Sequence, residues 1–391
     1  MRVTFVTFEY PPLIMGGAGV YAANLTKELA KLGHEVKVIT FGGEKCDNSH
    51  PTEKDGIIVD RVQGKASTLR WIALDLKISR KIGHAPRSQR PDVVHLNSLG
   101  YIGLRDKSKG PPYVATAHHL VGEIPKRAGL RFSDRIMDFF GENGFLIPAM
   151  ERFGTSFVDR IIAVSHKTAQ GLQTLYKVDF SRIDIIWNGV SEEVIPVGLI
   201  DPEEARRRLG LPAGKVILFV GRVDDPRKCL GNIIKAASGI PDTYVVAVGS
   251  GDGRRAMELA RELGMGSRVK FLGRLCQEEL WYAYLGADVH VCASQHEGFG
   301  LTIIEAMCAG CPVISTDVGI ARELSERLRA VVPVNDVPAL RSAIISTLSA
   351  STSIQQAKTV RVPEELSWRR CAMETVECYK KSIEEKSRTR Y

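Results

Sequence analysis

The stretch from Glu297 to Glu305, E-G-F-G-L-T-I-I-E, constrains the fold of this chain more than any other. The segment before it, 287–292, is typical of a short buried strand, and the run Leu301 to Ala309 contains good helix formers. The sequence therefore predicts a strand, a glycine-rich turn and a helix in direct succession. In this arrangement Glu297 lies in the loop that leaves the strand, and Glu305 lies about two turns into the helix.

Two glycines separate these carboxylates at the expected helix start. Gly298 and Gly300 carry no side chains, so backbone N–H groups and the positive end of the helix dipole stay accessible. A helix start of this kind binds anions. A carboxylate beside it repels phosphate, so we expect Glu297 and Glu305 to bind hydroxyl groups. A ligand with a diphosphate and many hydroxyls meets both conditions, which favours a nucleotide-sugar. The alternative is an ordinary turn flanked by two surface glutamates.

The nonapeptide and its continuation from Ala306 to Ile314, A-M-C-A-G-C-P-V-I, resemble the donor site of retaining glycosyltransferases of the GT-B fold, family 4. The resemblance extends over nearly the whole chain. It implies two doubly wound, Rossmann-like α/β domains that face a cleft. The N-terminal, acceptor-side domain covers 1–194, and the C-terminal helix 368–391 crosses back to it. The nucleotide-sugar donor domain covers 195–367.

Length and composition agree with a globular enzyme of two domains. The chain has 391 residues, 44% hydrophobic and 25% charged, and a formal charge of +8 that favours anionic partners. No basic block with interleaved aromatics is present, so nucleic acid is not expected as a partner. The first residues, Met1 to Phe8, lack the pattern of a signal peptide, and no apolar run approaches the roughly 20 residues of a membrane span. We expect a cytoplasmic protein, with attachment to the inner face of the membrane as an option.

The first β-α-β unit contains a glycine-rich loop. A strand at Val3–Thr7 and a helix at Gly16–Leu32 precede a strand at Glu35–Phe41. Gly17 to Ala22 matches the dinucleotide fingerprint G-x-G-x-x-A, but the long loop before it replaces the tight turn that this fingerprint needs. The sequence therefore disfavours a dehydrogenase. Binding of a nicotinamide cofactor would support that activity. The resemblance instead implies that Gly16 and Gly17 approach the donor diphosphate and the acceptor.

Two histidines follow the predicted strand Tyr113–Ala117 at its carboxyl end, where ligands bind in open α/β sheets. The family pattern is usually T-x-H-D, and His118 takes the histidine position, which implies contact with the transferred sugar. His119 replaces the usual aspartate, so the orientation and charge of His118 stay open. Two histidines in an ordinary polar loop are the alternative.

Two cations mark the start of the second domain. The predicted strand Val216–Val220 ends at Gly221 and Arg222, and Lys228 is expected to open the next helix. Two cations that face a helix start suit a diphosphate leaving group. They resemble the family motif G-R-x5-K-G, although Cys229 and Leu230 displace the final glycine. A solvated basic loop is the alternative.

The resemblance also implies a role for each site residue. Arg222 and Lys228 neutralise the leaving diphosphate, Glu297 binds the sugar, and His118 completes the site. These are the predicted catalytic residues. The implied donor-binding residues are Gly16, Gly17, Asn188, Gly221, Gly251, Leu272, Phe299, Gly300, Leu301, Thr302 and Glu305, the last of which binds the ribose hydroxyls. The implied enzyme is a retaining hexosyltransferase for a UDP- or GDP-sugar that uses neither a metal ion nor a cofactor.

The stretch from Lys126 to Phe157 combines cations with aromatic residues. Such a stretch can lie on a membrane surface, which favours a lipid-linked or membrane-proximal acceptor. An ordinary pair of helices that covers the sheet is the alternative. A soluble acceptor, such as a sugar phosphate or an α-glucan, also stays open.

An α-glucan synthase or phosphorylase and a sugar-nucleotide epimerase are other activities that share the implied fold. A sugar-nucleotide sensor without catalysis is a further alternative.

Two local features concern the cysteines and one glycine position. Cys308 and Cys311 form one C-x-x-C without a second pair, so we expect buried, reduced thiols. Ile320 stands where relatives often have the second glycine of D-x-G-G-x-x-E, with no predicted consequence.

Overall fold

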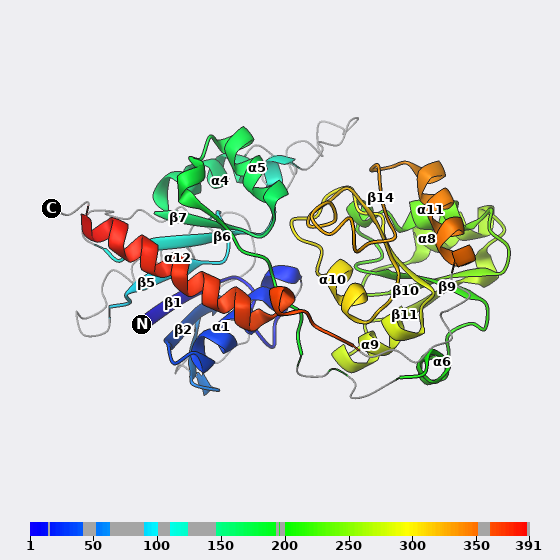
Figure 1. The fold of residues 1–391 in the computed structure, drawn as a ribbon, viewed down its shortest axis with the longest axis horizontal. Helices are drawn as coiled ribbons and strands as arrows, with labels where there is room; N and C mark the ends of the chain where they lie inside the picture. Colours follow the sequence, from blue (N-terminus) through cyan, green and yellow to red (C-terminus); the bar gives the residue numbers. More distant parts are fainter. Residues whose placement is uncertain are drawn as a thin grey trace. The chain divides into compact units, whose positions relative to one another are not determined.

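The computed structural model describes residues 1–14, 16–41, 52–62, 90–100, 110–123, 146–192, 195, 200–350 and 360–388 (Figure 1). The chain divides into two compact units, Met1–Gly189 with Trp368–Tyr391, and Val190–Ser367. The sequence analysis places this division at 194–195 and the return of the chain at 368. The residue types at 69–82 also predict a helix, and both this segment and the stretch 126–145 lie outside the described residues.

The first unit is built on an eight-stranded sheet with the order β3-β4-β2-β1-β5-β6-β7-β8, in which only the β3–β4 pair is antiparallel among the described strands. The strands are β1 (Arg2–Thr7), β2 (Glu35–Phe41), β3 (Thr52–Lys54), β4 (Ile57–Val62), β5 (Val93–Leu96), β6 (Tyr113–Ala117), β7 (Arg160–Ala163) and β8 (Ile183–Ile185). The central strands β5, β6 and β7 are buried along their whole length. Such continuous burial is typical of a parallel sheet that is covered on both faces.

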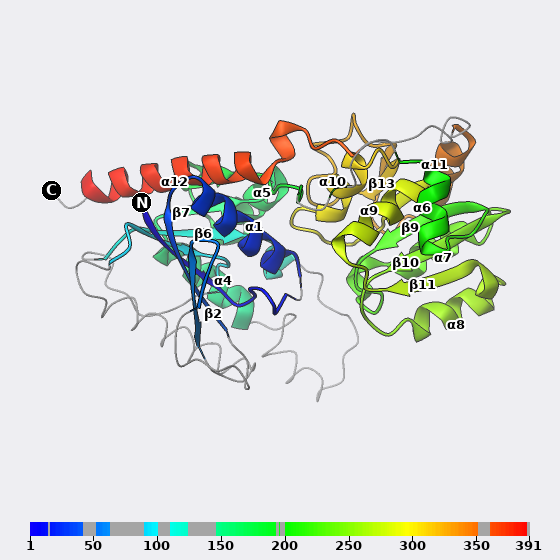
Figure 2. The ribbon, with the colours of Figure 1, turned by 90° about the horizontal axis from the view of Figure 1, so that it is seen from below.

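Helices from both ends of the chain cover this sheet. The helical segments are α1 (Gly17–Lys31), η2 (Val121–Glu123), α4 (Leu146–Phe157), α5 (His166–Tyr176), η3 (Phe180–Arg182) and α12 (Trp368–Arg388). Figures 1 and 2 show α12 beside α1, and the rings of Trp368 and Tyr21 meet edge to face with their centroids 5.7 Å apart. The last helix therefore belongs to the packing of the first unit.

The second unit is built on a six-stranded parallel sheet with the order β11-β10-β9-β12-β13-β14. The strands are β9 (Lys215–Val220), β10 (Thr243–Val248), β11 (Val269–Gly273), β12 (Val289–Cys292), β13 (Val313–Thr316) and β14 (Ala330–Val332). The helical segments are α6 (Pro202–Leu209), η4 (Pro226–Lys228), α7 (Leu230–Ala237), α8 (Arg254–Glu262), η5 (Gly266–Arg268), α9 (Gln277–Gly286), α10 (Leu301–Cys308), α11 (Val337–Ala350) and η7 (Glu364–Leu366).

The helices of this unit form two groups with the sheet between them (Figure 1). Helix α7 packs against both α8 and α11, while α9 packs against both α6 and α10. The fold class predicted from the sequence is therefore confirmed, because both units are α/β structures with doubly wound, mainly parallel sheets. Within the described residues, no helix is both long and apolar enough to span a membrane.

Local signals explain where several helices begin. Asp201 caps α6 by accepting a hydrogen bond from the backbone N–H of Glu203, and Pro202 occupies the first helical position. The prediction that Lys228 opens a helix is wrong. A short 3-10 turn ends at Lys228, Cys229 has a left-handed backbone with φ of 52°, and α7 begins only at Leu230.

Each sheet reverses its strand order at one point, between β1 and β5 in the first unit and between β9 and β12 in the second. On either side of such a point, successive connections run in opposite directions across the sheet. The loops at the carboxyl ends of these strands therefore leave a crevice in which ligands of doubly wound proteins bind. The two crevices are the natural places to look for the predicted site residues.

Candidate functional site

One group of predicted residues lies at the reversal point of the second sheet. Strand β9 runs into Gly221 and Arg222, and the adjacent strand β12 runs toward Ser294 and Glu297. Glu297 Oε1 accepts hydrogen bonds from Lys228 Nζ at 2.5 Å and from Ser294 Oγ at 2.6 Å. Two residues predicted for different parts of the donor are thus in direct contact.

The ion pair keeps Lys228 charged in a partly buried position. Burial alone would lower the pKa of the Lys228 ammonium, but the Glu297 carboxylate outweighs this effect and the net shift of the pKa is upward. The Lys228 side chain as a whole is 28% exposed. A protonated lysine in this position is suited to bind the oxygens of a phosphate group.

Arg222 is paired as well, with a residue that the sequence analysis did not select. Arg222 Nη2 donates to Asp225 Oδ2 at 2.7 Å, and Asp225 Oδ1 accepts from the backbone N–H of Arg227 at 3.0 Å to cap the η4 turn. Burial would raise the pKa of the Asp225 carboxyl, but the hydrogen bonds from Arg227 and Arg222 hold it well below its usual range. Asp225 is therefore ionised and holds the Arg222 guanidinium in place. Its position before Pro226, which is typical of a cap residue, is the sequence signal by which Asp225 could have been found.

The start of α10 has the open geometry that the glycines predict. Gly300 adopts φ of 99°, which favours glycine, and no side chain caps the helix. Because α10 begins at Leu301, Glu305 lies about one turn into the helix, and the expected depth of two turns is wrong. The Tyr284 hydroxyl donates to Glu305 Oε2 at 2.8 Å. Burial raises the pKa of Glu305 to about 7, and the hydrogen bond from Tyr284 offsets part of this rise.

The backbone before α10 is held by the segment after β13. The Ile320 N–H donates to the Phe299 carbonyl at 2.8 Å, and a Cβ on Gly319 would lie 2.2 Å from the same carbonyl oxygen. Gly319 also has φ of 52°, so the glycine required by this close approach is present. The Ile320 side chain is fully buried. Ile320, which replaces the second glycine of the family pattern, therefore adds an apolar side chain to the core. The hydrogen bond from its N–H to the Phe299 carbonyl is still present.

Glycines also allow the loops after β9, β10 and β11 to meet closely. A Cβ on Gly249 would lie 1.8 Å from the Gly221 carbonyl oxygen, and the Gly249 N–H donates to the Gly273 carbonyl at 2.8 Å. Gly251 adopts φ of 115° and faces the Asp224 carboxylate. Leu272 lies next to Gly273 on β11 and is partly buried. These loops thus bring backbone N–H and carbonyl groups together at one edge of the sheet.

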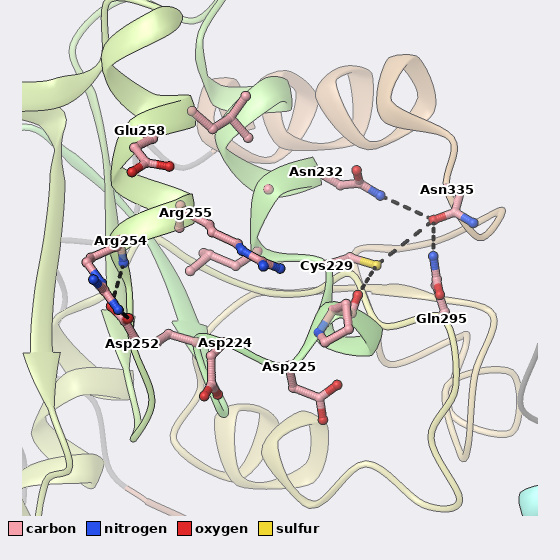
Figure 3. Close-up of a pocket in the computed structure, with 16 residues that line it drawn as sticks. Asp224, Asp225, Cys229, Asn232, Asp252, Arg254, Arg255, Glu258, Gln295 and Asn335 are labelled. Carbon is pink, nitrogen blue, oxygen red and sulfur yellow. Dashed lines mark hydrogen bonds and ion pairs between the residues drawn. The ribbon is translucent and has the colours of Figure 1, made fainter. Parts of the chain in front are cut away.

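A pocket of about 740 Å³ is lined in part by the η4 turn, which also contains Lys228 (Figure 3). Asn335 lies at one end, where its Oδ1 accepts from Asn232 Nδ2 at 3.3 Å and from Gln295 Nε2 at 3.1 Å. The charged lining consists of Asp224, Asp225, Asp252, Glu258, Arg254 and Arg255. More carboxylates than guanidinium groups line this space, so it is less suited to a diphosphate than the surroundings of Arg222 and Lys228.

The other group of predicted residues lies at the reversal point of the first sheet. Asn97, which follows β5, donates through Nδ2 to Thr7 Oγ1 at 3.0 Å and to the Ala18 carbonyl at 2.9 Å. The Ala18 carbonyl can only accept, so the Asn97 Oδ1 faces the other way, toward His118 Nε2 at 2.7 Å. Because this oxygen also can only accept, Nε2 of His118 must carry a proton. Asn97 therefore fixes the protonated nitrogen of the ring, and the sequence analysis did not select it.

His118 is uncharged at neutral pH. Burial lowers the pKa of its imidazole to about 3, and the neighbouring His119 contributes to the decrease. With a proton on Nε2, the neutral ring has its lone pair on Nδ1. The Tyr21 ring lies edge to face against the imidazole, with the centroids 4.7 Å apart. The charge and tautomer that the His119 replacement left open are thus set by burial and by Asn97.

The glycine loop before α1 is organised by Glu9. The Gly16 N–H donates to Glu9 Oε2 at 2.8 Å, and a Cβ on Gly19 would lie 2.8 Å from the same oxygen. Among the described residues beyond its chain neighbours, no atom lies within 4 Å of a Cβ built on Gly16. Gly17 is the first residue of α1. The tight contact of this loop is therefore at Gly19, where a Cβ would also lie 3.0 Å from the Glu9 Cβ.

The predicted residues thus fall into two sets in separate units. Arg222, Lys228, Glu297 and the α10 start lie in the second unit, while His118 and the loop of Gly16 and Gly17 lie in the first. Asn188 also lies in the first unit, and its buried Oδ1 has no hydrogen-bond partner within the described residues. Cys308 and Cys311 are both buried and free, as predicted.

Comparison with known families matches both halves of the chain. The family Glycosyltransferase Family 4 matches residues 15–194, and the family Glycosyl transferases group 1 matches residues 201–360. An uncharacterized glycosyltransferase of Methanocaldococcus jannaschii is 30% identical over 98% of this chain and 99% of its own length. The D-inositol 3-phosphate glycosyltransferase of Mycolicibacterium gilvum is 31% identical over 81% of this chain and 75% of its own length.

Solved structures show the same fold. The sucrose-phosphate synthase of Thermosynechococcus elongatus superposes with a TM-score of 0.77 at 23% identity, over 98% of this chain and 99% of its own. HepE of Anabaena, solved with UDP-glucose, superposes with a TM-score of 0.65 at 17% identity, over 100% of this chain and 99% of its own. Both similarities cover the two units together.

Proposed function

This chain belongs to glycosyltransferase family 4, whose members retain the anomeric configuration, and we propose that it transfers a hexose from a UDP- or GDP-sugar to a small phosphorylated polyol. The transfer of a sugar from a nucleotide-sugar follows from the family. The donor base, the hexose and the acceptor are the parts that are proposed. The Anabaena structure with UDP-glucose supports the choice of donor, and the printed activity of the Mycolicibacterium relative supports the choice of acceptor.

The arrangement of charges at the reversal point of the second sheet carries the proposal. Lys228 contacts Glu297 in the loop before α10, Arg222 lies on the loop that follows β9, and each cation is paired with a carboxylate. A donor diphosphate can take the place of these carboxylates, because its oxygens accept hydrogen bonds from both cations and from backbone N–H groups. As the bond to the sugar breaks, negative charge builds up on the diphosphate, and cations fixed in advance stabilise it.

The remaining roles follow from the contacts around these cations. When a phosphate oxygen binds Lys228, Glu297 becomes available as an acceptor for sugar hydroxyls, and Ser294 holds its Oε1 in place at 2.6 Å. Glu305 binds the ribose hydroxyls. In the first unit, neutral His118 binds a hydroxyl of the transferred sugar. The leaving phosphate takes the proton of the acceptor hydroxyl, so that the new bond forms on the same face of the sugar.

A membrane-proximal acceptor is the competing proposal. Of the stretch 126–157, the structure describes only α4, which exposes 46% of Phe153 and places its ring 4.3 Å from that of Phe157. One exposed and one partly buried aromatic ring on the same helix are compatible with lipid contact, but the cations of the stretch at 126–135 lie outside the described residues. The relative that acts on a phosphorylated inositol therefore favours a soluble, phosphorylated acceptor.

A transfer assay with two groups of acceptors tests the proposal. UDP- and GDP-hexoses are first screened by thermal shift, because a ligand at about 100 times its dissociation constant adds roughly 2.7 kcal/mol of stability. The best donor is then incubated with inositol phosphates and sugar phosphates, or with lipid-linked acceptors in anionic vesicles. We expect release of the nucleoside diphosphate only with a phosphorylated polyol, and a product with the anomeric configuration of the donor by NMR.

Other outcomes identify the alternatives. Transfer only to the lipid-linked group would replace the polyol by a membrane acceptor. Interconversion of sugars without an acceptor would identify an epimerase, and donor binding without transfer or hydrolysis would identify a sensor. Elongation of an α-glucan would identify a synthase.

A further inference from the structure

Tyr284 lies at the centre of the second unit and contacts a predicted donor-binding residue. It is the third residue from the end of α9 and is fully buried. Its ring meets His290 edge to face at 89°, with centroids 5.5 Å apart, and lies 6.2 Å from the Trp281 ring. Its hydroxyl donates to Glu305 Oε2 at 2.8 Å. Packing by two aromatic neighbours fixes the ring, so the position of the hydroxyl is fixed as well.

The hydrogen bond orders one half of the Glu305 carboxylate. The Glu305 side chain projects from α10, whereas Tyr284 belongs to α9, so the bond joins two helices of the same group. Within the described part of the chain, the Glu305 Oε1 accepts no hydrogen bond, and the residue is only partly buried. An ionised carboxylate has about four acceptor sites, so a bond to Oε2 leaves enough of them for two further hydroxyl groups.

We propose that Tyr284 is a positioning residue for nucleotide binding, whose hydroxyl holds Glu305 Oε2 so that the carboxylate faces the 2′- and 3′-hydroxyls of the ribose. This inference rests on the proposed role of Glu305. A glutamate has several rotatable bonds, and a carboxylate that is held at one oxygen loses less conformational freedom when the ribose binds. The bond also opposes protonation of the carboxylate, because the phenol donates to the ionised form.

The geometry separates this role from packing. Replacement of Tyr284 by Phe removes only the hydroxyl and keeps the ring between His290 and Trp281. Tyr282 provides a matched control on the same helix, since it is buried and its hydroxyl accepts from Arg208 Nη1 at 2.7 Å, away from Glu305. Each variant therefore loses one hydrogen bond between α9 and a neighbouring helix, and only Tyr284→Phe affects Glu305.

Calorimetry with UDP and with 2′,3′-dideoxy-UDP tests the inference. If the donor screen selects guanine, GDP and 2′,3′-dideoxy-GDP take their place. The proteins are the full chain and the variants Tyr284→Phe, Tyr282→Phe and Glu305→Ala, each checked for its thermal midpoint. We expect Tyr284→Phe to weaken UDP binding about tenfold, as for loss of a hydrogen bond to a charged group, and to leave dideoxy-UDP binding nearly unchanged. Tyr282→Phe should change neither. In the transfer assay, Tyr284→Phe should raise the donor KM and leave kcat within about twofold, because the reacting atoms are not touched.

Three results would overturn the inference. Equal losses with UDP and dideoxy-UDP in Tyr284→Phe would indicate a general disturbance of the unit rather than a ribose effect. Unchanged UDP binding in Tyr284→Phe would show that the hydroxyl does not position Glu305. Full retention of the ribose preference in Glu305→Ala would remove the assigned role of Glu305, and with it that of Tyr284. By contrast, failure of sugar transfer with every acceptor would reject the proposed activity and leave this binding test valid.

Discussion

The two units hold their candidate residues by different kinds of interaction. In the first unit His118 is neutral, and the uncharged side chain of Asn97 fixes it. In the second unit the side chains of Arg222 and Lys228 form ion pairs with carboxylates. A neutral, prearranged site suits hydroxyl groups, which need hydrogen bonds of fixed direction. An ionic site suits a diphosphate, since its charge can replace that of the carboxylates.

The difference also affects what each unit must do when a ligand arrives. The His118 contact needs no exchange of partners, because its Nδ1 lone pair remains after Asn97 has bound Nε2. The cations, however, must release or share their carboxylates. On the proposed assignment, a diphosphate that binds Lys228 also releases Glu297, the residue proposed to bind the sugar. Four experiments test this difference between the two units.

The largest effect should come from the cations of the second unit. We expect Arg222→Ala and Lys228→Ala each to lower turnover by roughly 10²- to 10³-fold, because a preorganised charge partner of the leaving diphosphate is lost. Steady-state transfer kinetics with the best donor measure this effect. Arg254→Ala is a suitable control, since Arg254 is also paired with an aspartate but its side chain is 85% exposed. Near wild-type turnover in both site variants would contradict the diphosphate assignment.

The second experiment separates the two glutamates. Glu305→Ala should weaken binding of the free nucleoside diphosphate by roughly one to two orders of magnitude, because the acceptor for the ribose hydroxyls is lost. Glu297→Ala should leave this binding nearly unchanged and reduce transfer, because it is assigned to the sugar. Calorimetry with the nucleoside diphosphate alone distinguishes them. The opposite pattern, with nucleotide affinity dependent on Glu297 only, would reverse the two assignments.

The third experiment introduces charge into the neutral site. Asn97→Asp places a carboxylate beside His118, which should raise the pKa of the imidazole from about 3 and lower transfer about tenfold. NMR titration of His118 and steady-state kinetics measure the two effects. Asn24→Asp, in α1, is a control, because Asn24 only donates to the Val20 carbonyl of its own helix at 2.8 Å. If His118 stays neutral and transfer is unchanged in Asn97→Asp, the role of Asn97 in holding the ring is wrong.

The parts of this site that could be predicted from the sequence are those carried by short segments. Glu297 lies in the loop before α10 and Glu305 in the second turn of that helix, and Arg222 and Lys228 lie on one loop, so the short spacing within each pair indicates that its members are near each other. Their partners are different. Asn97 is distant in sequence from His118, as Tyr284 is from Glu305, and each pair meets only because different elements of the sheet and its helices pack together. Sequence patterns describe one element at a time, which explains why both partners were missed.

The wrong helix start at Lys228 has a related origin. The pattern of a strand followed by a basic loop predicts a helix, but the cap formed by Asp225 and the left-handed backbone of Cys229 insert a separate turn. A non-glycine residue with positive φ is uncommon, so this geometry could not be expected from residue types alone. The insertion places Lys228 at the end of a rigid turn, where its ammonium reaches Glu297.

The smallest effect should appear in the pH dependence of donor binding. The phosphates of a nucleotide-sugar do not titrate near neutrality, so changes in its affinity between pH 6 and 8 report on the protein. Burial raises the pKa of Glu305 to about 7, which means that the carboxylate needed for the ribose becomes ionised as the pH rises through this range. The pKa of His118, about 3, lies far below it. We therefore expect affinity to increase about fivefold from pH 6 to pH 8 in the wild type and in His118→Gln, and to stay constant in Glu305→Gln. Calorimetry at three pH values measures this, and a pH dependence that persists in Glu305→Gln would assign the titrating group to another residue.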